Sequence, residues 1–127
     1  MCSSDLHSPV QVDHDTGGQR DARQERNRDL WQVSIGDAQY RWLQETLAAS
    51  DAAYKFVFAH HVLGTGRGGV ELADQYEWGG KDRRGKDQFA EKRPGWEMPI
   101  HQLFVKHGVS VFFQGHDHLF EIGRAHV

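Results

Sequence analysis

The sequence predicts an α/β fold built around an internal sheet. Two short apolar runs, residues 54–59 and 109–113, are rich in β-branched and aromatic side chains, and each indicates a buried strand. A helical pattern precedes each run, over residues 37–49 and 99–107. The order helix, strand, long connection, helix, strand is typical of α/β architecture.

The first helix is expected over residues 37–49. Tyr40, Leu43 and Leu47 repeat at helical spacing and form one apolar stripe. Asp37 is of a residue type that caps helices, so we expect it to cap this one.

The second helix is expected over residues 99–107. Pro99 suits the first turn, because its fixed φ is already helical, and Gly108 is a typical stop signal. The apolar stripe of this helix consists of Ile100, Leu103 and Phe104.

Two stretches show no clear periodicity. Residues 7–29 are polar and dense in charge, which indicates a surface excursion or a linker. Residues 63–98 are rich in glycine and are expected to form a long loop. A loop of that length is either functional or a sign that it contains helices or strands that the sequence pattern does not reveal.

Composition limits the class of protein. A chain of 127 residues with 38% hydrophobic residues and four Trp is expected to form one folded domain or part of one. The net charge of -3 gives no reason to expect nucleic acid or an anionic membrane as a partner. No apolar run approaches the roughly 18 residues of a membrane span. The single cysteine, Cys2, excludes a disulfide framework and leaves the compartment open, export included.

Both ends of the chain resemble translated sequencing adapters. Residues 122–127 read as the forward adapter and residues 1–6 as its reverse complement. Such segments are set aside in fold reasoning. We therefore expect the native protein segment to be residues 7–121, an internal piece of a longer gene.

Histidines follow both expected strands. His60 and His61 come after the first, and His116 and His118 come after the second, beside Gly115. Side chains two apart at a strand end point the same way, and α/β folds bind ligands at the carboxyl ends of strands. The pattern predicts a metal site across the sheet edge. Neutral imidazole suits Zn, Fe and Mn alike, so these ligands do not select the metal.

These residues resemble a known family. The run from Lys55 to His61, followed by Gly115-His116-Asp117-His118, is similar to the C-terminal half of the calcineurin-like metallophosphoesterases. The purple acid phosphatases are one branch of that family. The resemblance implies that residues 7–121 are the C-terminal portion of a β-sandwich domain flanked by helices.

The resemblance also implies a site for two divalent or mixed-valence metal ions, Fe, Mn or Zn. His60 and His116 would bind one ion, and His118 would bind the other. Val62 stands where many members have proline, and the choice between His60 and His61 stays open. The family's remaining ligands and its general acid belong to N-terminal motifs that this sequence lacks.

The implied activity is hydrolysis of phosphate mono- or diesters by metal-activated water. Arg67 or Lys81 would contact the substrate phosphate, and Trp78 or Trp96 would wall the pocket. The alternatives are a non-catalytic histidine metal-binding module and a degenerate family member. We expect the chain, expressed alone, to be poorly soluble and inactive.

Overall fold

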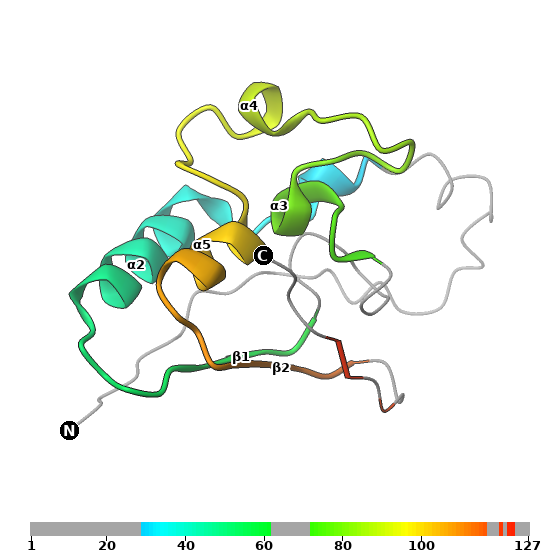
Figure 1. Ribbon diagram of the computed structural model, residues 1–127. Helices are drawn as coiled ribbons and strands as arrows, with labels where there is room; N and C mark the ends of the chain where they lie inside the picture. The colour runs from blue at the N-terminus through cyan, green and yellow to red at the C-terminus, as the bar shows by residue number, and fades with distance from the viewer. Residues whose placement is uncertain (1–28, 62–71, 117–119, 121, 124–127) are drawn as a thin grey trace, which may run out of the picture.

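The computed structural model describes residues 29–61, 72–116, 120 and 122–123, and it is a mixed helix and strand structure (Figure 1). The strands β1 (Phe56–Ala59) and β2 (Val111–Gln114) pair in parallel. The helices lie on one side of this pair. They are η1 (Leu30–Gln32), α2 (Gly36–Ala49), α3 (Tyr76–Gly79), α4 (Phe89–Lys92) and α5 (Ile100–Lys106). This arrangement is compatible with the expected α/β class.

Helix α2 confirms the first predicted helix. Tyr40, Leu43 and Leu47 are buried, as the stripe predicts, and Ser50 is the C-cap residue of the helix. The prediction that Asp37 caps the helix is wrong. Ile35 is the N-cap residue, and the Asp37 carboxylate instead accepts a hydrogen bond of 2.7 Å from Trp96 Nε1.

Helix α5 confirms the second predicted helix. Pro99 is its N-cap residue, and its apolar stripe is buried, with Ile100 and Leu103 fully inaccessible to solvent. Gly108 follows with a φ of 65°, a left-handed conformation that glycine adopts without steric cost. The glycine therefore ends the helix as the sequence predicts.

The two strands are less buried than expected. Phe56 and Phe58 are 56% and 73% exposed, and Phe113 is 47% exposed. Side chains alternate along a strand, and Val57 and Phe112 turn toward the helices, where they pack against the core. The prediction of buried strands is wrong for this reason: within the described residues, helices cover one face of the sheet and nothing covers the other.

The expected long loop contains secondary structure. Within it, α3 and α4 are single helical turns, which are too short to show an apolar stripe in the sequence. Gly79 permits the chain to fold back on itself, because a Cβ there would lie 2.2 Å from the Asp74 Cα. Trp78 stacks on Phe112 with ring centroids 5.0 Å apart and joins the core.

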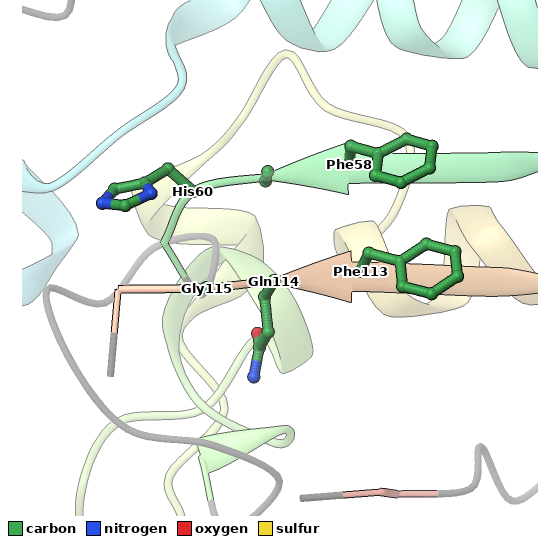
Figure 2. Close-up of a pocket in the computed structure, with 6 residues that line it drawn as sticks. Phe58, His60, Phe113, Gln114 and Gly115 are labelled. Atoms are coloured by element: carbon green, nitrogen blue, oxygen red, sulfur yellow. The ribbon is translucent and has the colours of Figure 1, made fainter. Parts of the chain in front are cut away.

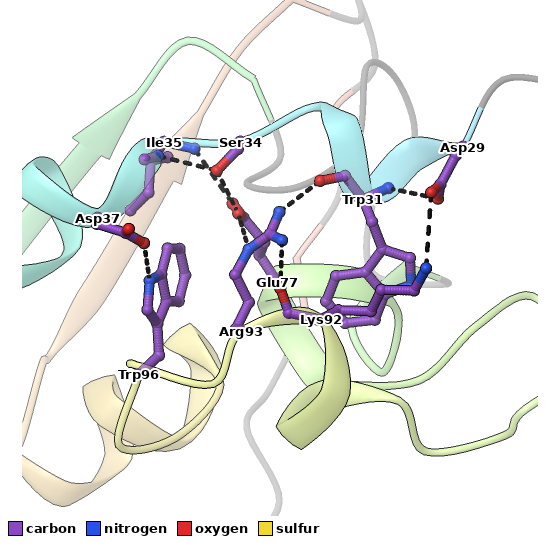
Figure 3. Close-up of polar contacts among 10 residues, drawn as sticks. Asp29, Trp31, Ser34, Ile35, Asp37, Glu77, Lys92, Arg93 and Trp96 are labelled. Carbon is purple, nitrogen blue, oxygen red and sulfur yellow. Dashed lines mark hydrogen bonds and ion pairs between the residues drawn. The ribbon is translucent and has the colours of Figure 1, made fainter.

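A buried ion pair fastens this region to the start of α2 (Figure 3). Glu77 is fully buried, and its Oε1 lies 2.6 Å from Arg93 Nε. Ser34 Oγ donates to the same oxygen at 2.6 Å, and the Ile35 amide donates to Oε2 at 3.2 Å. The Arg93 guanidinium also donates to the carbonyl oxygens of Trp31 and Lys92. Both charges are thus hydrogen-bonded, which a buried pair requires.

We expect Glu77→Ala to lower the free energy of unfolding by about 3–5 kcal/mol, because it leaves the Arg93 charge, whose side chain is only 13% exposed, without its partner. Glu77→Gln, which keeps the volume and one acceptor, should fall between this variant and the parent. Urea unfolding measures the change. The exposed Glu45→Ala is the control and should shift stability by less than about 0.5 kcal/mol. Equal losses at Glu77 and Glu45 would contradict the role of the pair.

Candidate metal centre

The pairing of the two strands brings His60 close to His116. In the register of the ladder, Phe58 pairs with Phe113 and Ala59 with Gln114. The Gly115 amide then donates a hydrogen bond of 3.0 Å to the His60 carbonyl oxygen, which continues the contact one step beyond the strands. Residues that are far apart in the chain therefore leave the sheet side by side.

Three imidazoles meet at this edge of the sheet. His60 Nε2 lies 3.4 Å from His116 Nδ1, and the His61 ring stacks on that of His116 with centroids 3.9 Å apart. Each of the three residues offers one ligand atom, and these atoms lie within 4.8 Å of one another. The cluster could hold a metal ion.

The distance between the two closest ring nitrogens, His60 Nε2 and His116 Nδ1, fits a metal site. Two nitrogens about 2.0–2.1 Å from a tetrahedral zinc lie about 3.3–3.4 Å apart. The separation between His60 Nε2 and His116 Nδ1 is 3.4 Å. The same distance also permits a hydrogen bond between the two rings when one nitrogen is protonated. The donor set and its spacing are therefore compatible with metal binding and with a hydrogen-bonded imidazole pair.

The chain turns at His116. Its φ is 73°, in the left-handed region that non-glycine residues rarely adopt. Gly115, the residue before it, is not among the glycines with positive φ. Strained backbone of this kind is found disproportionately at functional sites.

A shallow cavity of about 340 Å³ lies next to His60 (Figure 2). Phe58 and Phe113 form one wall, with nearly parallel rings 4.8 Å apart. His60 is exposed, whereas His61 and His116 are half-buried. The cluster therefore lies at the surface, where a small solute can reach it.

The remaining site residues predicted from the sequence do not belong to the described cluster. His118 and Arg67 lie outside the described residues. Lys81 lies 3.6 Å from Asp74 in an exposed ion pair. Trp78 and Trp96 are buried in the core, so the expectation that they wall a pocket is wrong.

The sequence left open which of His60 and His61 is the ligand. Strict alternation along a strand places His60 and His61 on opposite faces, which favours a structural role for one of them. Strand β1 ends at Ala59, and beyond it the alternation no longer applies. The structure therefore brings both rings to His116, with His60 and His61 centroids 4.7 Å apart.

No protein-family model, curated protein or solved structure matches this chain. Among the described residues, none of the helices has the length and apolar character needed to cross a bilayer.

Replacing His116 tests the backbone strain. We expect His116→Gly to be more stable than His116→Ala by about 1 kcal/mol, because a left-handed φ costs an L-residue about 1–2 kcal/mol. Both variants lose the imidazole, so their difference isolates the backbone. His101, inside α5, is the control, where Ala should be more stable than Gly by about 1 kcal/mol. The same order at both positions in denaturant unfolding would argue against strain at His116.

Proposed function

We propose that this chain is part of a binuclear-metal phosphoesterase of the calcineurin-like type, which hydrolyses phosphate mono- or diesters. The observation that supports the proposal is the pairing of His60 with His116. The two follow adjacent parallel strands, and their ring nitrogens are 3.4 Å apart. This is the arrangement that the sequence resemblance implies for two ligands of one ion.

In the proposed site, His60 binds through Nε2 and His116 through Nδ1, the two nitrogens that face each other. His118 is proposed as a ligand of the second ion. When bound, the cations lower the pKa of coordinated water and offset negative charge on the phosphoryl oxygens. The histidines of this chain contribute neutral donors and fixed positions.

The bare face of the sheet supports the proposed β-sandwich. Phe56, Phe58, Val111 and Phe113 are all exposed on it. A sheet with an apolar face normally buries that face against a second layer. In a β-sandwich a second sheet lies about 10 Å away and fills this role. The helices on the opposite face already form the outer layer (Figure 1).

A metal-binding module without catalysis is the second candidate. The donors that the structure gathers are imidazoles alone, and no carboxylate belongs to the cluster within the described residues. A site without an anionic bridging ligand has little to offset the repulsion between two divalent cations. This composition favours binding of a cation over two-metal chemistry for the chain by itself.

The test of the proposed function uses the source gene with its upstream coding sequence. We expect the product to bind two metal equivalents and to hydrolyse p-nitrophenyl phosphate or its bis ester. His116→Ala should remove one equivalent, as measured by elemental analysis, and lower the rate by at least roughly 100-fold. His101→Gln should change neither property, since His101 lies on α5 beside Trp78. An unchanged metal content in His116→Ala would refute the assignment.

A further inference from the structure

A second cavity, of about 380 Å³, lies between η1 and the turn at residues 82–86. Its volume is in the range of small-molecule sites, which is about 300–1,000 Å³. No residue that lines it belongs to the histidine cluster or to the cavity beside His60. The lining residues are Asp29, Leu30, Trp31, Tyr76, Asp82, Arg83, Arg84 and Gln88.

Two cations of this cavity have no anion bound to them. Arg83 and Arg84 are exposed, and neither guanidinium forms an ion pair or a hydrogen bond within the part of the chain that the structure describes. The charge of Asp82 acts on Arg84 only at longer range. A guanidinium presents its N–H donors in a planar fork that matches two oxygens of a carboxylate or a phosphate. The cavity therefore offers a pair of unused forks to an oxyanion.

The Asp82 carboxylate is already engaged by the turn itself. Its Oδ1 accepts hydrogen bonds of 2.8 Å from the Arg84 amide and 2.9 Å from the Lys86 amide. The Asp82 amide donates in turn to the Lys86 carbonyl oxygen at 2.9 Å. These bonds fix the backbone that presents the two arginines, and a turn that is already ordered loses less entropy when a ligand binds.

Trp31 and Tyr76 form the aromatic part of the cavity, with their rings edge to face and centroids 5.6 Å apart. Trp31 is 3% exposed, and its Nε1 has no hydrogen-bond partner among the described residues. A buried donor without a partner costs free energy, which an acceptor that reaches it would offset. Tyr76 has a left-handed φ of 46°, and backbone strain of this kind is frequent at ligand sites.

The second carboxylate of the cavity, that of Asp29, is engaged as well. It accepts a hydrogen bond of 3.1 Å from the Trp31 amide and lies 3.8 Å from Lys92 Nζ (Figure 3). Both acidic side chains thus serve donors of the protein, whereas the guanidinium donors of Arg83 and Arg84 remain available.

We propose that this cavity binds a small organic oxyanion, with a phosphate or carboxylate group held by Arg83 and Arg84. The organic part of the ligand would lie against Leu30 and the edge of the aromatic pair, which fills volume that an inorganic ion leaves empty. The proposal goes beyond the proposed function and does not depend on it, since no metal ion takes part.

Titration of the 127-residue chain, freed of metal with a chelating resin, tests the proposal. The probes are phenylphosphonate and benzoate, which carry the two kinds of oxyanion on the same apolar ring. Without metal, the histidine cluster cannot hold either probe through an ion. The indole N–H signal of Trp31 in nitrogen-15 NMR spectra, assigned by comparison with Trp31→Phe, should shift saturably as the probe is added.

Arg83→Gln and Arg84→Gln should each weaken binding by about 10-fold or more, the loss expected for one charge-assisted hydrogen-bonding group. Lys86→Gln is the matched control, because it removes a positive charge from the same turn and Lys86 does not line the cavity. It should change the affinity by less than about 3-fold at physiological salt, where exposed charges are screened. All three side chains are exposed, so the variants should fold, which circular dichroism checks.

Saturable binding of either probe, weakened in both arginine variants, supports the proposal, and the probe that binds more tightly identifies the oxyanion. If neither probe saturates the Trp31 signal, the proposal is wrong. Equal losses in Lys86→Gln and the arginine variants would also overturn it, because they indicate general attraction to a basic turn. Binding that His60→Ala abolishes would place the probe at the histidine cluster instead. None of these results decides the phosphoesterase activity, which has its own test.

Discussion

The parallel ladder between β1 and β2 joins segments 55 positions apart in the chain, from Phe56 with Val111 to Ala59 with Gln114. Because parallel strands end at the same edge, this register alone determines which residues emerge together. A slip by one residue would turn Phe58 and Phe113 to opposite faces and separate His60 from Gly115. The histidine cluster therefore depends on a main-chain contact more than on any contact between its own side chains.

The helices maintain that register from one side. Val57 and Phe112 are the strand residues that pack against the buried core of α2 and α5 and against Trp78. The pair between Glu77 and Arg93 in turn fastens the turn of α3 to the segment before α2. The hydrogen bonds of this pair join two segments that are 43 positions apart in the chain.

Periodicity was sufficient to locate the two main helices, because Tyr40, Leu43 and Leu47 in α2 and Ile100, Leu103 and Phe104 in α5 lie on single faces. Periodicity could not show that the strands bury only one face, since a short apolar run has the same sequence pattern whether one face or both faces of the strand are buried. The Glu77 pair and the participation of His61 depend on contacts between distant segments. Asp37 illustrates the same limit. Its local sequence predicts a helix cap, but its carboxylate accepts a hydrogen bond from Trp96, which is distant in the chain.

X-ray absorption spectroscopy of the zinc-loaded chain tests the central claim most directly, because its multiple-scattering features count imidazole ligands. We expect imidazole nitrogens at about 2.0 Å from the zinc. One imidazole should be lost in each of His60→Ala and His116→Ala. A first shell composed mainly of oxygen, or an imidazole count that these substitutions leave unchanged, would contradict the claim that the β1–β2 edge builds a metal centre.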